Sequence, residues 1–121
     1  MTPSEYTKLA IRTESPREVI GNPVTNRILH ASIGLSTESG ELLDQIKKHL
    51  FYGKELDMQN IKEEIGDMLW YTSILCDAAE YPMEQAMKDN IDKLAKRYGD
   101  KFSDYNALNR DTTHELNHIG G

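Results

Sequence analysis

Two pairs of acidic residues are the part of this sequence best able to do chemistry. Glu38 and Glu41 form one pair, and Glu64 and Asp67 form the other. Residues three positions apart lie on the same face of an α-helix, so each pair projects both carboxylates from one side. Carboxylates that meet repel one another and resist loss of water unless a cation lies among them. The pattern predicts a site for Mg²⁺, which prefers oxygen ligands, with Mn²⁺ as a substitute.

Both pairs border an apolar stripe when residues are placed about 100° apart around a helix. The first stripe contains Ala31, Leu35, Leu42, Leu43, Ile46 and Leu50, and the second contains Ile61, Ile65, Met68, Leu69, Thr72, Leu75 and Cys76. One acid pair alone is common on a solvated helix face. Two pairs at matching edges favour a metal site, because antiparallel packing of the stripes would bring all four carboxylates together. Glu63 points away from them and suits solvent or a supporting role.

A third helical segment carries residues suited to phosphate. Asn90, Lys93 and Arg97 line one margin of the stripe formed by Met83, Met87, Ile91, Leu94 and Tyr98. Lysine and arginine offer phosphate oxygens charge and hydrogen-bond donors, and asparagine can add another hydrogen bond. Taken alone, this margin is typical of an ordinary charged helix flank. Beside an acid-bound cation it predicts a polyphosphate-binding surface.

Residues 114–118 read HELNH, which matches the HExxH zinc pattern of metalloproteases. On a helix, His114 and His118 would share a face, with Glu115 as the general base. Zincins take a third ligand from chain beyond this motif, and three residues follow His118. We therefore interpret the match as chance, within a polar tail over residues 112–121 that we expect to be flexible.

The positioning elements are predicted to be helices, because strand signals are almost absent. A capping box at Thr2 opens a short helix that reaches about Arg12. The longer helices are expected from Pro23 to about Phe51, from a cap at Asp57 to about Glu80, and from Pro82 to Gly99. The sequence thus predicts an all-α fold, a helical bundle of three main helices plus a short N-terminal helix.

Two apolar residues, Trp70 and Ile74, lie off the core stripe. We expect them to pack against another copy of the chain, so that oligomerisation to a dimer or a tetramer completes the bundle.

The length and the net charge of the chain limit the classes of function that it can have. The chain has 121 residues, enough for a single domain, and a net charge of -6, which argues against binding a nucleic acid polymer through charge. No stretch approaches the length of a membrane span, so no membrane partner is expected. The single Cys76 excludes an internal disulfide and fits a reducing compartment. These features predict a cytoplasmic protein.

The segments GLSTESGELLDQIKKH, KEEIGDMLWY, NIDKLAKRYGDKFS and NRD together resemble a known family. They are similar to the MazG-like nucleoside triphosphate pyrophosphohydrolases of the all-α NTP pyrophosphatase superfamily, from His30 to Asp111, which implies a single domain over residues 1–111. The family motif, Glu-Glu-x-x-Glu followed by Glu-x-x-Asp, maps onto Glu38 and Glu41, then Glu64 and Asp67. Thr37 replaces the first glutamate, and its helix position is predicted to turn it away from the four acids.

The resemblance implies Mg²⁺ on the four acids and cleavage of an NTP or dNTP between the α- and β-phosphates, giving NMP or dNMP and pyrophosphate. Lys93 and Arg97 would hold the pyrophosphate, with Asn90, Lys101 and Arg110 as weaker substrate contacts. The alternative is a non-catalytic or weakly active helical oligomerisation or regulatory module that retains a metal or nucleotide site. Base and sugar preference, biological purpose, the number of metal ions and the carboxylate that orients the water stay open.

Overall fold

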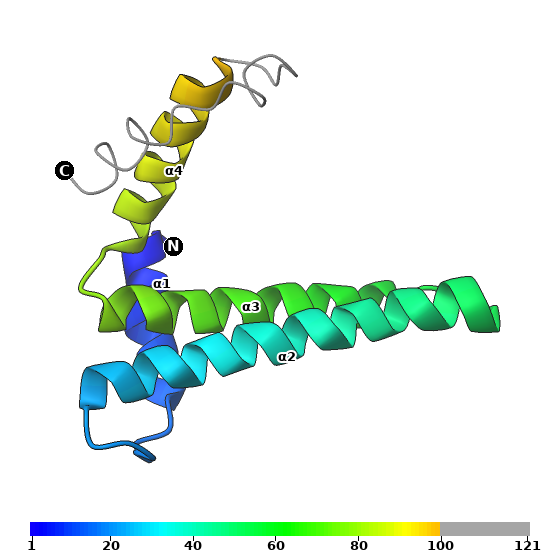
Figure 1. Cartoon of the computed structure of the whole chain (residues 1–121), viewed down its shortest axis with the longest axis horizontal. Coiled ribbons are helices and arrows are strands. Elements are labelled where there is room, and N and C mark those ends of the chain that lie inside the picture. Colours follow the sequence, from blue (N-terminus) through cyan, green and yellow to red (C-terminus); the bar gives the residue numbers. More distant parts are fainter. Residues whose placement is uncertain (100–121) are drawn as a thin grey trace. The chain divides into compact units, whose positions relative to one another are not determined.

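The computed structural model describes residues 1–99, and within this range every regular element is a helix (Figure 1). The elements are α1 (Pro3–Ala10), a short 3₁₀ helix η1 (Ile11–Thr13), α2 (Pro23–Tyr52), α3 (Met58–Ala78) and α4 (Met83–Tyr98). The prediction of an all-α fold with three main helices and a short first one is therefore confirmed. None of these helices combines the length and the hydrophobicity needed to cross a membrane.

The helices begin and end at the local signals in the sequence. Thr2 caps α1 reciprocally with Glu5: the Thr2 Oγ1 accepts from the Glu5 N–H at 3.1 Å, and Glu5 Oε1 accepts from the Thr2 N–H at 3.2 Å. Asn22 and Asp57 cap α2 and α3 by accepting, at 3.0 Å, from the N–H three residues on. Gly53 ends α2 with φ of +67°, a left-handed conformation that favours glycine.

The chain divides into two compact units, Met1–Tyr81 and Pro82–Gly121. The first contains α1, α2 and α3. Within it, α2 and α3 lie side by side in antiparallel directions, and α1 packs against α3 (Figure 1). The described part of the second unit is α4, which ends before Gly99. The predicted metal-binding acids therefore belong to the first unit and the predicted phosphate-binding residues of α4 to the second.

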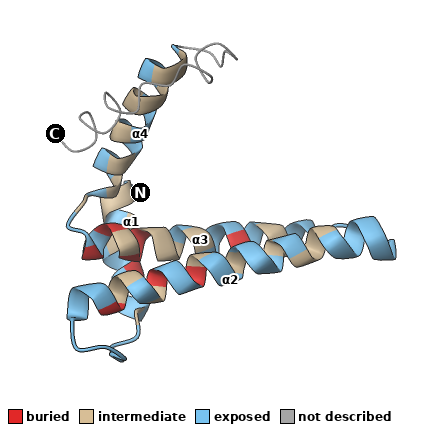
Figure 2. Cartoon of the chain, in the orientation of Figure 1, coloured by how far each residue is buried: buried red, intermediate tan, exposed pale blue. Residues whose placement is uncertain are grey.

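The core of the first unit gathers around the end of α3 that α1 contacts (Figure 2). Ala31 from α2 and Ile74 from α3 are 0% exposed. Gly34 permits the close approach of the two helices, because a Cβ at this position would overlap the ring of Tyr71. The prediction that Ile74 packs against a second copy is wrong, since the chain itself buries this side chain completely.

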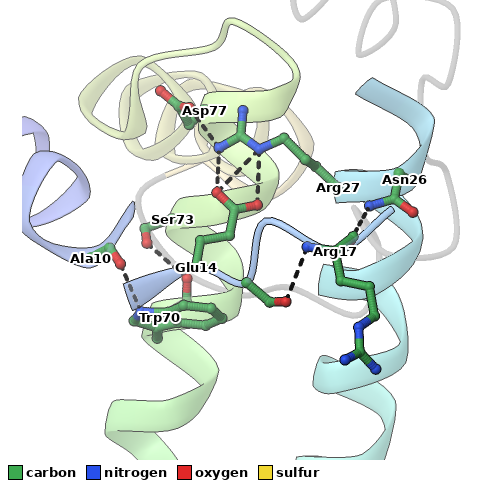
Figure 3. A network of polar contacts seen from close by, with 9 residues as sticks. Ala10, Glu14, Arg17, Asn26, Arg27, Trp70, Ser73 and Asp77 are labelled. Carbon is green, nitrogen blue, oxygen red and sulfur yellow. Dashed lines mark hydrogen bonds and ion pairs between the residues drawn. The ribbon is translucent and has the colours of Figure 1, made fainter. Parts of the chain in front are cut away.

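Trp70 is also used inside the chain. Its indole N–H donates to the carbonyl of Ala10 and to the hydroxyl of Thr13, both at 3.0 Å (Figure 3). The ring packs edge-on to Tyr71, with centroids 5.1 Å apart, and to His30 at 6.3 Å. Trp70 thus joins α3 to the end of α1, and it stays half-buried, so its predicted place at an interface between copies stays a prediction.

A partly exposed ion-pair network lies at the same end of the unit (Figure 3). Arg27, near the start of α2, contacts both carboxylate oxygens of Glu14 and also Asp77 Oδ2, which lies 2.7 Å from its Nη2. These hydrogen bonds, with Glu14 first, raise the pKa of the Arg27 guanidinium. The amide of Asn26 accepts from the N–H of Val19 and donates to the carbonyl of Arg17, so the middle of the loop before α2 is held against that helix.

Candidate metal centre

The facing surfaces of α2 and α3 bring three acids together in the middle of the helix pair. Glu38 and Glu41 come from α2 and Glu64 from α3, and each offers one carboxylate oxygen within 4.8 Å of the others. The two α2 residues meet because they are one turn apart on the helix. Glu64 joins them through the antiparallel register of α3. The arrangement can supply oxygen ligands to a single divalent cation.

Hydrogen bonding in this cluster is incomplete. Glu64 is only 5% exposed, and its Oε2, like Oε2 of Glu38, is shielded from solvent without a hydrogen-bond partner. A shielded acceptor that lacks a partner destabilises the folded chain, and a charged one does so more strongly. A cation among the three carboxylates would satisfy these oxygens and remove their repulsion. The residues present therefore fit a hard divalent ion such as Mg²⁺.

Crowding changes how the acids hold protons. Hydrogen bonding with Glu64, followed by its charge, raises the pKa of Glu41 above its ordinary 4.5. The pKa of Glu64 is raised as well, first by hydrogen bonding with Glu38 and then by burial. Like charges and loss of water both disfavour the ionised carboxylate. Without a cation, Glu41 and Glu64 thus hold protons more tightly than isolated glutamates do.

Asp67 lies next to the trio without being part of it. It is exposed on α3, one turn after Glu64. Its charge contributes to the raised pKa of Glu41 and of Glu64, and, after burial, to that of Tyr71. Asp67 therefore acts electrostatically on the trio from the adjacent turn. Its predicted role as a fourth metal ligand stays a prediction.

An open cavity of about 520 Å³ lies beside the acids. It is lined by Thr37, Gly40, Glu41, Asp44, Gln45, Lys48, Asn60 and Glu64. Its cation, Lys48, is paired with Asp44 at 2.8 Å. Sequence reasoning missed Gln45 and Lys48, although the signal was available: they follow Glu41 by four and seven residues, which is the spacing of one helix face.

Thr37 also borders this cavity, on the side of Glu41. Its hydroxyl donates to the carbonyl of Gly34 at 3.0 Å, and the residue is exposed. The prediction that position 37 turns away from the acids is wrong, because it shares the cavity wall with two of them. A longer acidic side chain at this position would therefore project from the rim of the site.

The predicted phosphate contacts are described in part. Asn90, Lys93 and Arg97 lie on α4, at spacings that place them along one side of that helix. The guanidinium of Arg97 lies 5.5 Å from the ring centroid of Tyr98. Lys101, Arg110 and the HELNH segment at 114–118 lie outside the described residues. The role of all these residues in substrate binding stays a prediction.

Comparison with known families supports a family assignment. The model of the MazG nucleotide pyrophosphohydrolase domain matches residues 29–102. This range contains the three clustered glutamates, Asp67 and the basic margin of α4. No curated protein and no solved structure matches the chain.

Proposed function

Because the chain belongs to the MazG nucleotide pyrophosphohydrolase domain family, we propose that it is a Mg²⁺-dependent enzyme that hydrolyses nucleoside triphosphates between the α- and β-phosphates. The products are a nucleoside monophosphate, ribo or deoxy, and pyrophosphate. The observation that supports this most is the trio Glu38, Glu41 and Glu64, with two shielded carboxylate oxygens that lack a partner. Such a cluster is unfavourable alone and favourable around a cation.

The acids would hold the ion between the two helices. Glu38, Glu41 and Glu64 are proposed as ligands from the trio, and Asp67 as a fourth from the adjacent turn. Mg²⁺, when bound, screens the charge of the triphosphate and lowers the pKa of a bound water. Because Glu64 is buried and Glu41 is exposed, the site is closed toward the helix interface and open toward the cavity. The nucleotide would therefore approach through that cavity.

The leaving pyrophosphate requires positive charge. We propose that Lys93 and Arg97 of α4 supply it, with Asn90, Lys101 and Arg110 as weaker contacts. Arginine can bind two phosphate oxygens at once, and lysine adds a point charge. Changing Arg97 to Lys would therefore weaken binding through lost geometry at constant charge.

We propose that a homo-oligomer, a dimer or a tetramer, covers the apolar side chains that remain exposed near the acids. Leu43, Leu50 and Phe51 are 68%, 66% and 76% exposed. Ile65 and Leu69 on α3 are also about half exposed, although they belong to the predicted core stripe. Large apolar side chains left exposed in this number are typical of a surface that another protein covers. Light scattering should show a dimer or larger, and the Leu50→Glu variant should dissociate; a wild-type monomer at micromolar concentration would contradict the proposal.

The enzymatic proposal is tested by incubating the protein with mixed NTPs and dNTPs in Mg²⁺ or in EDTA. Chromatography of the nucleotides and an assay for pyrophosphate should show monophosphate and pyrophosphate in equal amounts, in Mg²⁺ alone. The order in which the nucleotides disappear reports base and sugar preference. Diphosphate and inorganic phosphate as products would contradict cleavage between the α- and β-phosphates.

A second function, a module without useful turnover, is favoured by one observation. Thr37 stands on the cavity wall where the family motif has glutamate. A site short of one carboxylate could bind a metal or nucleotide weakly and act through assembly. Nucleotide binding without turnover in the same assay would support this function.

A further inference from the structure

Gln45 lies on α2, one turn beyond Glu41, and lines the same cavity as Glu41 and Glu64. Its amide nitrogen and amide oxygen are both shielded from solvent, and neither has a hydrogen-bond partner. A glutamine amide can donate two hydrogen bonds and accept two, so this side chain leaves all of them unmade. Such an arrangement costs stability in the protein without ligands.

The other shielded atoms without a partner belong to the same site. Among the described residues, the shielded side-chain atoms that lack hydrogen bonds are Nε2 and Oε1 of Gln45, Oε2 of Glu38 and Oε2 of Glu64. Nε2 is a donor, and the two carboxylate oxygens are acceptors. The site therefore contains a buried donor and buried acceptors that remain unpaired. The other shielded side-chain atoms of residues 1–99 have hydrogen-bond partners, so the unpaired polar atoms are confined to the surroundings of the acids.

We propose that Gln45 is a positioning residue for the metal centre, whose Nε2 donates to Oε2 of Glu64 when the acids hold a divalent cation. This inference rests on the proposed function of the acids. A carboxylate that binds a metal through one oxygen is commonly oriented by a hydrogen bond to the other. Gln45 can supply that bond without adding charge. Lys48, the cation on the cavity wall, is engaged by Asp44 at 2.8 Å, so it is less available for this role.

The proposal predicts effects of opposite sign on stability and on metal binding. Replacing the amide of Gln45 with an apolar side chain of the same length removes two unpaired polar atoms, which should stabilise the metal-free protein. The same change removes the donor that orients Glu64, which should weaken metal binding. A side chain with a purely structural role would not separate the two effects in this way.

The experiment compares wild type with Gln45→Met, which keeps the length of the side chain. Gln59→Met is the matched control, because Gln59 is exposed on α3 and does not line the cavity. Thermal unfolding in EDTA measures the stability of the metal-free protein, and calorimetric titration with Mn²⁺ measures affinity. We expect Gln45→Met to raise the unfolding midpoint in EDTA by roughly 4 °C and to raise the Kd for Mn²⁺ about tenfold. The control should change neither.

Each contrary result has a distinct meaning. An unchanged Kd for Mn²⁺ in Gln45→Met, with wild type binding normally, would overturn the role of Gln45 and leave the metal centre intact. A lower midpoint in EDTA, or failure of the variant to fold by circular dichroism, would show that the amide already has a structural partner and would also overturn it. Absence of Mn²⁺ binding by wild type would overturn the metal centre and this inference together.

Discussion

Two regions of the α2–α3 pair, the end that α1 contacts and the region around and beyond the acids, differ in how completely their side chains are buried and hydrogen-bonded. At the end that α1 contacts, Ala31 and Ile74 are fully buried, and the polar groups of Arg27 and Trp70 have partners. Around and beyond the acids, Leu43 and Leu50 are exposed, and shielded atoms of Glu38, Gln45 and Glu64 have no hydrogen-bond partner. One pair of helices thus contains a region whose polar groups are hydrogen-bonded and a region where shielded polar atoms have no partner.

The difference separates stability from function. Apolar burial and complete hydrogen bonding at the first end favour the folded chain by themselves. The crowded carboxylates of the trio lower the stability of the folded chain until a cation binds, and reduced stability of this kind is typical of functional sites. Substitutions at the end that α1 contacts should therefore lower the unfolding midpoint and leave metal binding unchanged. Substitutions of the acids should reduce metal binding and activity without lowering the unfolding midpoint.

The largest effect is expected from removing one acid of the trio. Glu64→Gln keeps the shape of the side chain and loses a ligand charge, so Mg²⁺-dependent pyrophosphate release should fall at least about 100-fold. Its unfolding midpoint in EDTA should not fall, because repulsion is relieved. Glu38→Gln, Glu41→Gln and Asp67→Asn should also lose activity. The control is Glu63→Gln, an exposed neighbour on α3; full activity in two of the four variants would contradict the assignment.

The second prediction concerns a substitution that removes apolar packing at the end of the helix pair that α1 contacts. Ile74→Ala should destabilise the fold by about 2–5 kcal/mol, because it leaves a cavity at a fully buried position. For a domain of this size the unfolding midpoint should fall by about 10 °C or more. Ile33→Ala, at a half-exposed position of α2, is the control and should shift it far less. Below the unfolding transition, the affinity of Ile74→Ala for Mn²⁺ should match wild type; a large loss would show that the two ends are coupled.

A smaller effect is expected from adding an acid at the rim. Thr37→Glu places a carboxylate on the cavity wall beside Glu41, so the Mg²⁺ concentration for half-maximal activity should fall, by up to about tenfold. Thr37→Gln has the same size without the charge and should not produce this gain. A Mg²⁺ titration of both variants makes the comparison. Equal behaviour of the two would argue that position 37 does not reach the ion.

The smallest effect concerns pH. The pKa of Glu41 and of Glu64 is raised in the folded chain, so the folded state binds protons more tightly than the unfolded state. The resulting stabilisation is present below the ordinary pKa of 4.5 and is lost as pH rises through the raised values. In EDTA, the unfolding midpoint of wild type minus that of Glu64→Gln should therefore decrease from pH 4.5 toward pH 7. Saturating Mg²⁺ should abolish this decrease; a difference that grows with pH in EDTA would contradict the cause.

Helical wheels anticipated much of the candidate site and failed where a helix has more than one neighbour. They placed Glu38, Glu41 and Glu64 on facing edges, which the structure also does. They misplaced Ile74, because α3 packs against α1 as well as α2 and therefore buries a side chain outside a single stripe. Gln45 was overlooked, although it follows Glu41 by four residues and therefore shares its helix face; its unpaired amide became evident only in the structure.

The sequence by itself determined the helices and the acid spacing. Caps at Thr2, Asn22 and Asp57 and the left-handed Gly53 act over three or four residues, so they can be read locally. Only the tertiary structure decided that Glu64 meets Glu41 while Asp67 stays one turn away. That choice depends on the register of two antiparallel helices, set by contacts such as Gly34 against Tyr71, between residues far apart in the chain. Spacing along one helix cannot encode the offset between two, because many registers bury similar apolar area and side-chain packing selects among them.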